Sequence, residues 1–304
     1  PVKETYVLGN SSKDVNGDDA KIFKALYPIA PPKKDQSTDS AGSKGSGNGE
    51  IALYWLFAYQ NPSVPAIGNP GRGKADLIIN GDITNDEWFS ALMQIIMILI
   101  TYQKVFSLTH NDLHTNNIMY NSTNKKFLYY TYKKKTYKVP TFGKLYKIID
   151  FGRAIYKFNG KLFCSDSFQP GGDAATQYNT EPYLNEKKPR LEPNYSFDLC
   201  RLACSIFDYV VEDFDEIKDL SKCSDPVKRL IVEWCLDDKG VNMLYKGNGV
   251  DRYPDFKLYK MIARCVHNHT PQAQLERPEF NAYSSFKGEV PADVIDIDKI
   301  PSYV

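Results

Sequence analysis

The chain has 304 residues, and its 38 Lys and Arg residues nearly balance its 37 Asp and Glu residues, for a formal net charge of +1. This balance excludes a polybasic nucleic-acid coat or an acidic disordered tail as the main feature. Hydrophobic residues make up 42% and charged residues 25%, which is typical of globular proteins. The length allows one large domain or two lobes with separate cores, at roughly 100–200 residues per domain.

The first 80 residues combine short elements with long polar stretches. Residues 5–8 and 20–27 are predicted as strands, and 31–49, rich in Pro, Ser, Asp and Gly, as a mobile loop. A helix is predicted to begin at Glu50, and the Pro- and Gly-dense stretch 61–74 favours a hinge between two lobes. The chain begins with Pro rather than Met, so we expect that it has been trimmed or that a segment precedes it.

A long helix is predicted next, over residues 84–106. Thr84 as N-cap and Glu87 three residues later form the pattern of a capping box. The apolar run 88–100 is too short to cross a bilayer and carries Gln94 at its middle. We therefore expect a buried core helix and no membrane segment.

Strands and then helices are predicted in the second half of the chain. Residues 126–150 favour three strands and 195–280 several helices, and the Pro- and Asp-rich tail after Gly288 is expected to run along the surface. The six cysteines have no regular spacing and form no Cys-x-x-Cys motif. Cys200 and Cys204 share one helical face, which favours thiols in a core and a reducing compartment.

One constellation of polar residues points to chemistry. Asp112 and Asn117 lie five positions apart in a segment that follows the long helix, and Asp150 follows an apolar strand and precedes Phe151 and Gly152. Transfer of a phosphoryl group to a hydroxyl needs a carboxylate beside the acceptor and oxygen ligands for Mg²⁺. Either motif alone occurs by chance in turns and caps, but their joint occurrence in this order favours phosphoryl transfer.

These motifs resemble the eukaryotic-type protein kinase superfamily, whose loop reads His-Arg-Asp-Leu-x-x-x-Asn before Asp-Phe-Gly. Four segments are most similar in sequence to the serine/threonine protein kinases of large nucleocytoplasmic DNA viruses: residues 110–120, 138–154, 196–203 and 252–260. The resemblance extends over about residues 84–283 and covers the first 80 residues poorly.

The resemblance implies an α+β, bilobal, protein-kinase-like fold. A small, reduced, β-rich N-lobe would occupy residues 1–66, and a larger, mainly α-helical C-lobe would occupy 67–304, with an activation segment at 150–183. It also implies an ATP-dependent serine/threonine protein kinase, with ATP and Mg²⁺ as cofactors and a Ser- or Thr-containing protein as substrate. The viral relatives imply the host cytoplasm, with packaging in the virion as a further expectation.

Residue roles follow from the resemblance position by position. Asp112 would be the catalytic base, and Asn117 and Asp150 would be the Mg²⁺ ligands, Asn117 thereby also belonging to the catalytic set. His110 and Asp198 would have structural roles, with Asp198 holding the backbone of the catalytic loop.

Two further positions are assigned structural roles, and two depart from the family pattern. Arg277 matches the late structural arginine, and Glu181 is assigned as its partner. Asn111 stands where the family has the Arg that receives an activation-loop phosphate, so we expect no switching by phosphorylation there. His114, counted with the catalytic residues, replaces a loop Lys and is similar to aminoglycoside phosphotransferases, which leaves a small-molecule acceptor open.

The nucleotide-binding residues of the N-lobe are the least regular part of the resemblance. Gly9 and Asn10 are the candidates for the phosphate-covering loop, Lys24 for the phosphate-binding lysine and Glu50 for its partner, and Lys21 competes with Lys24. The 8–15 segment lacks two of the three loop glycines, so a catalytically weak or inactive pseudokinase acting as a viral scaffold stays open.

The interval between Asp112 and Asp150 is longer than is usual in the family. The additional residues, rich in Lys and Tyr, are predicted to form a basic hairpin within 125–147, inserted in the C-lobe. Such a hairpin can bind an acidic partner or nucleic acid through charge and stacking. The alternative is a solvated strand face without a partner.

Overall fold

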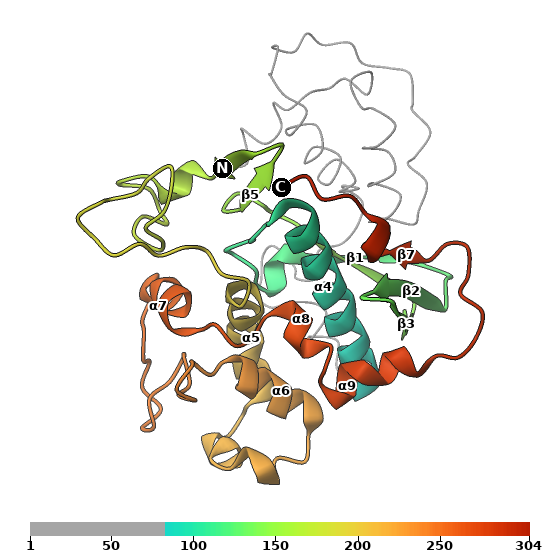
Figure 1. Cartoon of the computed structure of the whole chain (residues 1–304). Coiled ribbons are helices and arrows are strands. Elements are labelled where there is room, and N and C mark those ends of the chain that lie inside the picture. The colour runs from blue at the N-terminus through green and yellow to red at the C-terminus, as the bar shows by residue number, and fades with distance from the viewer. Residues whose placement is uncertain (1–82) are drawn as a thin grey trace, which may run out of the picture.

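The computed structural model describes residues 83–304. The N-lobe candidates Gly9, Asn10, Lys24 and Glu50, the 31–49 loop and the 61–74 hinge lie outside the described residues. The described part has a mixed α+β fold, in which one long helix lies between a group of small sheets and a group of helices (Figure 1).

The long helix is α4, Asn85–Phe106, and its predicted capping box is confirmed. The Thr84 hydroxyl accepts the backbone N–H of Glu87, and the Glu87 carboxylate accepts the backbone N–H of Thr84. The apolar run 88–100 is extended by its neighbours to a helix of 22 residues, which by length and composition alone would be long and apolar enough to cross a membrane. However, 89% of its most apolar window is buried within the fold, as in a core helix.

The strands form three small antiparallel pairs, and the three strands predicted within 126–150 are confirmed. β1 (Ile118–Ser122) pairs with β4 (Lys144–Ile148), β2 (Phe127–Tyr132) with β3 (Lys135–Pro140), and β5 (Ile155–Phe158) with β6 (Lys161–Cys164). The Gln94 side chain, in the middle of α4, accepts the Tyr146 N–H and donates to the Lys144 carbonyl. This polar residue therefore docks the helix against the backbone of β4.

The tail, residues 289–304, runs mostly along the surface, as expected, but Ile295 enters the core, which the sequence did not indicate. β7 (Ile295–Asp296) pairs in parallel with β2, giving the strand order β3-β2-β7. Ile297 and Ile300 are also buried. Figure 1 shows the tail passing over the sheet and ending close to β5, where Asn159 donates its N–H to the Tyr303 carbonyl at 2.7 Å.

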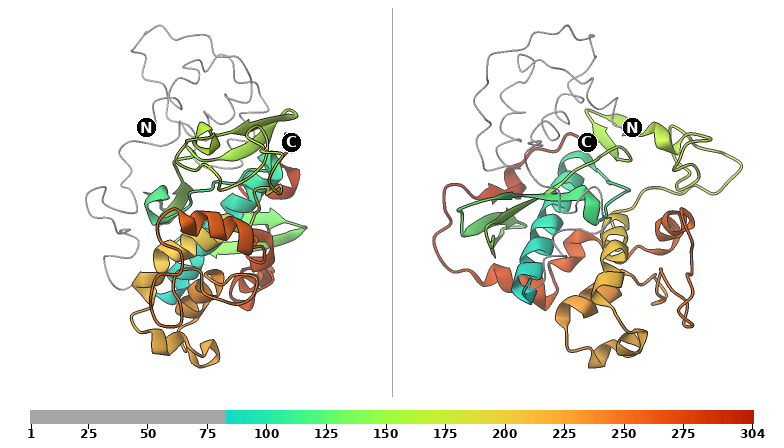
Figure 2. Two further views of the ribbon diagram at one scale, coloured as in Figure 1. Left: turned by 90° about the vertical axis from the view of Figure 1, so that its left-hand side faces the viewer. Right: turned by 180° about the vertical axis from the view of Figure 1, so that it is seen from behind.

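The helices predicted for 195–280 are confirmed, and the view from behind in Figure 2 shows α5, α6 and α7 on the side of α4 away from β2 and β3. The α-helices are α5 (Phe197–Val210), α6 (Pro226–Trp234), α7 (Lys257–Cys265), α8 (Pro271–Gln274) and α9 (Pro278–Asn281). The 3₁₀ helices are η2 (Thr115–Asn117), η3 (Asp166–Phe168), η4 (Phe214–Ile217), η5 (Leu220–Lys222), η6 (Ala282–Ser285) and η7 (Ile297–Lys299).

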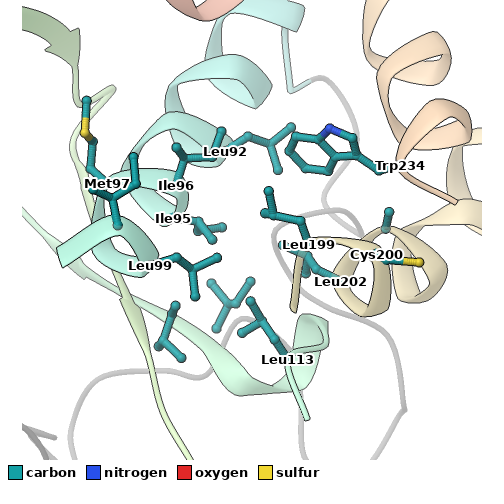
Figure 3. Packing of buried hydrophobic residues seen from close by; sticks show 14 of the residues in the cluster. Leu92, Ile95, Ile96, Met97, Leu99, Leu113, Leu199, Cys200, Leu202 and Trp234 are labelled. Carbon is teal, nitrogen blue, oxygen red and sulfur yellow. The ribbon is translucent and has the colours of Figure 1, made fainter. Parts of the chain in front are cut away.

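Apolar side chains between α4 and α5 form the centre of the core. Figure 3 shows α4 side chains facing Leu199 and Leu202 of α5, with Trp234 of α6 closing one end. Leu113 enters the same cluster from the loop after α4 and is fully buried. Burial of such a side chain contributes about 1.5–3 kcal/mol, so Leu113 anchors this loop to the core.

All six cysteines lie in the described part and are free thiols. Cys200 and Cys204 are buried in the core together with Cys235, which confirms that the shared helical face holds core thiols. Cys265 is the last residue of α7. The two histidines that follow it are held by hydrogen bonds within the protein: His267 Nδ1 lies 2.6 Å from an Asp238 oxygen, and His269 Nε2 donates to the Leu236 carbonyl.

Candidate functional site

The 110–117 loop, which carries the candidate residues, is held from α5 by one carboxylate. Asp198 is fully buried, and its two oxygens accept the backbone N–H groups of His110 and Asn111 at 2.9 and 2.8 Å. This is the contact that the resemblance implied for Asp198. Burial raises the pKa of Asp198 above its ordinary value, against the lowering effect of His110 and the two N–H groups.

Backbone and ring contacts join this loop to the segment that carries Asp150. The His110 Nε2–H donates to the Ile149 carbonyl at 2.8 Å, while its Nδ1 accepts the Asp112 N–H at 3.3 Å. The Ile149 N–H donates to the Asn117 carbonyl at 2.9 Å. Because Ile149 directly precedes Asp150, these contacts bring Asp150 beside Asn117. Both ring nitrogens of His110 make contacts, which fixes the orientation of the ring.

Asn117 and Asp150 present oxygen atoms that could hold a hard cation. The Asn117 amide nitrogen donates to the Asp112 carbonyl at 2.9 Å, so the amide oxygen points elsewhere. Asp150 is exposed and has a left-handed backbone, with φ of 58°. Its Oδ1 accepts the Gly152 N–H at 3.3 Å. Amide and carboxylate oxygens are the ligands that Mg²⁺ prefers, so the donor chemistry of this pair fits Mg²⁺.

The Asp112 carboxylate is directed by side chains from three parts of the chain. Oδ1 accepts the Tyr259 hydroxyl at 2.7 Å, and Oδ2 lies 3.5 Å from the Arg153 guanidinium. His114 Nε2 is 3.8 Å from Oδ1. The Asp112 side chain remains 21% exposed, so it is aimed by its neighbours while part of it is open to an approaching group.

His114 is neutral at neutral pH. Burial, as the largest effect, lowers its pKa below the ordinary 6.5, against the raising effect of Asp112. The neutral Nε2 can accept from the Asn117 amide, which lies 3.3 Å away. The approach of His114 to Asp112 is therefore a contact of a neutral ring with a carboxylate, not an ion pair.

Asn111 is fully buried and connects the loop to two other segments. Its amide nitrogen donates to the Thr109 carbonyl and hydroxyl, both at 3.1 Å, and to the Arg153 carbonyl at 2.9 Å. Its amide oxygen accepts the Tyr178 hydroxyl at 2.8 Å. The backbone is left-handed here, with φ of 64°, a region in which Asn is favoured over most residues. A hydrogen bond between two uncharged side chains, Tyr178 and Asn111, thus connects the 168–191 segment to the 110–117 loop.

The pairing of Glu181 with Arg277 is wrong. Arg277 pairs with Glu233 of α6 and approaches Glu279 at 4.0 Å. Glu181 is 54% exposed on the 168–191 segment, with Arg190 at 3.9 Å. Arg277 precedes α9 and faces α6, so Glu233 occupies the place that sequence matching assigned to Glu181.

A cavity of about 440 Å³ lies between the 168–191 segment and α7. Arg264 of α7 bridges the two, because its guanidinium donates to the Thr176 carbonyl at 2.9 Å. Apolar side chains and several cationic ones line the cavity, which no sequence motif indicated. The lining includes Phe168, Tyr178, Tyr183, Lys188, Arg190 and Leu191.

The basic hairpin is β2 and β3 with a two-residue turn, because β4 returns to β1. Lys133 and Lys134 form the turn with φ of 49° and 62°, and their N–H groups both donate to the exposed Asp298 carboxylate at 2.8 Å. Lys125 pairs with Asp293 at 2.7 Å. Acidic residues of the chain's own tail therefore contact part of the surface that was predicted to bind an acidic partner.

Sequence reasoning missed three residues that complete this arrangement: Arg153, Tyr178 and Tyr259. Arg153 directly follows Asp150-Phe-Gly, so proximity along the chain was an available signal. Tyr178 and Tyr259 reach the loop only through the folding of distant segments. No local pattern distinguishes them among the 21 tyrosines.

Comparisons with known protein families and curated proteins found no relative of this chain. No protein-family model matches the chain, and no curated protein sequence matches it either. Within residues 83–304, no group of three or more His, Cys, Asp and Glu side chains is placed to hold a metal ion.

Proposed function

We propose that the chain is an ATP-dependent protein kinase of the eukaryotic type that phosphorylates Ser or Thr in a protein. The observation that carries this proposal is the convergence of three residues. One loop holds Asp112 and Asn117, and the hydrogen bond from the Ile149 N–H to the Asn117 carbonyl brings the next residue, Asp150, close to Asn117. A carboxylate and two oxygen ligands are the set that phosphoryl transfer to a hydroxyl requires.

In this proposal Asp112 accepts or orients the proton of the acceptor hydroxyl while that oxygen attacks the γ-phosphorus of ATP. The bond from the γ-phosphorus to the β,γ-bridging oxygen breaks, and ADP leaves. Asn117 and Asp150 would hold Mg²⁺, which offsets phosphate charge when bound. His114, neutral and hydrogen-bonded to Asn117, helps to fix the side-chain amide whose oxygen would bind the metal.

The wider organisation is part of the same proposal. Residues 83–304 would belong to the larger lobe of a bilobal kinase, and the smaller lobe would supply Lys24, Glu50, Gly9 and Asn10 to the nucleotide. A virus-encoded enzyme acting in the host cytoplasm, or packaged in the virion, would match the viral resemblance of the motifs.

The test is phosphate transfer by the full chain. Purified protein with ATP–Mg²⁺ should label casein or itself, and Asp112→Asn should abolish the label. Asp293→Asn is the matched control, because it makes the same chemical change at an exposed residue that pairs with Lys125. Equal transfer by wild type and Asp112→Asn would contradict the assignment of the base.

The glycine-poor 8–15 segment favours a second candidate, a kinase-shaped scaffold without catalysis. A ligand that binds only the folded state raises the melting temperature. An unchanged melting temperature in millimolar ATP–Mg²⁺, together with no transfer, would favour the scaffold.

Transfer to a small molecule, suggested by His114, is less well supported. The Tyr178–Asn111 hydrogen bond orders the 168–191 segment beside a cavity wide enough for a peptide side chain. This arrangement favours a protein acceptor.

A further inference from the structure

The Tyr259 hydroxyl makes the shortest side-chain contact of the candidate base. It donates to Asp112 Oδ1 at 2.7 Å from helix α7, 147 positions further along the chain. A hydrogen bond to an ionised carboxylate is about twice as strong as one between neutral groups. The contact is therefore strong enough to select one orientation of the carboxylate.

Tyr259 is itself fixed by α5 and α7. Phe256, which directly precedes α7, stacks on its ring with centroids 5.0 Å apart and an interplanar angle of 18°. The Arg201 guanidinium of α5 lies 4.8 Å from the ring centroid, and Phe197 contacts the ring from the start of α5. Since α5 also carries Asp198, one helix supports both the loop backbone and the tyrosine.

The backbone contacts of the loop leave the carboxylate free to rotate. Asn117 holds the Asp112 carbonyl and His110 holds its N–H, but neither limits the two side-chain torsions. Those torsions are limited most closely by Tyr259 at 2.7 Å, and by Arg153 at 3.5 Å and His114 at 3.8 Å. A proton acceptor works only when its lone pair is aimed at the acceptor hydroxyl.

We propose that Tyr259 is a positioning residue: its hydroxyl holds Oδ1 of Asp112 so that the rest of the carboxylate faces the acceptor. This inference rests on the proposed kinase function. It extends the logic by which a catalytic base is oriented by a third group, here a tyrosine from α7. Arg201 and Phe256 act one step further away, by holding the ring.

Tyr259→Phe tests this role because it keeps the ring, the Phe256 stack and the Arg201 guanidinium over the ring, and removes only the hydroxyl with its hydrogen bonds. We expect kcat for transfer to casein to fall about ten- to a hundredfold, as for other small misplacements of catalytic groups. The KM for ATP should stay within about twofold, because Tyr259 contacts the base and not the metal-ligand pair.

Tyr245→Phe is the matched control. It removes a tyrosine hydroxyl that donates to Asp208 at 2.6 Å, a comparable contact outside the candidate site. This variant should keep wild-type kcat. The melting temperatures of both variants show whether either change acts through folding.

Two outcomes would overturn the positioning role while wild-type transfer is intact. An unchanged kcat in Tyr259→Phe would show that Asp112 is aimed without the hydroxyl. A lower KM for casein with an equal or higher kcat would show that Tyr259 occupies the acceptor position and excludes substrate. If the wild type transfers no phosphate at all, the proposed function fails first and the inference with it.

Discussion

Two aspartates in this molecule make the same contact in opposite environments. Asp198 and Asp298 each accept two consecutive backbone N–H groups with their two oxygens, at 2.8–2.9 Å. Each also serves a segment with left-handed residues, Asn111 in one case and Lys133 with Lys134 in the other. Asp198 is fully buried, whereas Asp298 is exposed to solvent.

The environment reverses the direction in which the pKa of the aspartate is shifted. Burial raises the pKa of Asp198, whereas the N–H groups of Lys134 and Lys133 outweigh slight burial and lower the pKa of Asp298. If Asp298 is removed, water can reach the turn N–H groups. If Asp198 is removed, the N–H groups of His110 and Asn111 stay buried without an acceptor. A buried N–H group without a partner costs far more free energy of folding than an N–H group that exchanges a carboxylate for water.

The largest effect should follow from Asp198→Ala. Loss of both acceptors leaves two buried N–H groups without partners, and we expect the free energy of unfolding to fall by about 3–5 kcal/mol. Urea unfolding of the full chain measures this change. A loss below about 1 kcal/mol would mean that the loop N–H groups find other acceptors and that burial does not make the Asp198 contact more stabilising than the exposed one.

Asp298→Ala should have a much smaller effect. The turn N–H groups can exchange the carboxylate for water, so we expect a loss of about 0.5–1.5 kcal/mol in the same assay. Asp293→Ala, which removes only the exposed Lys125 pair, should cost less still. If Asp298→Ala were as damaging as Asp198→Ala, burial would not explain the difference between the two contacts.

The smallest effect should be the pH dependence of the Asp298 contribution. Its pKa is below the ordinary 3.8 in the folded chain, so its stabilisation is complete above that value and is lost as the pH falls through the folded pKa. Wild type and Asp298→Ala should therefore converge in stability below about pH 3.8. The comparison needs conditions in which both remain folded, such as added osmolyte; a gap that widens on acidification would refute the sign.

Local patterns allowed part of this structure to be predicted. The Thr84–Glu87 capping box and the three strands within 126–150 follow from local patterns, whereas the contact of Asp198 with the loop was implied by the resemblance to protein kinases. The mixed α+β class, implied by the same resemblance, is confirmed.

Contacts that depend on the packing of distant elements were not predictable in this way. Arg277 selects Glu233 over Glu181 because α6 lies beside α9, which spacing along the chain does not encode. Tyr259 meets Asp112 only after α7 packs on α5. In the tail, the alternation of Ile295 and Ile297 is too short to distinguish a buried strand from a polar surface segment.

The parallel pairing of β7 with β2 affects how the protein is synthesised. The hairpin of β2 and β3 is complete early, but the strand that covers its other edge is translated only after all the helices that follow. An open strand edge is a template for pairing with another chain. During translation, this edge of β2 therefore stays open to pairing with another chain until Ile295 and Asp296 emerge and close the sheet.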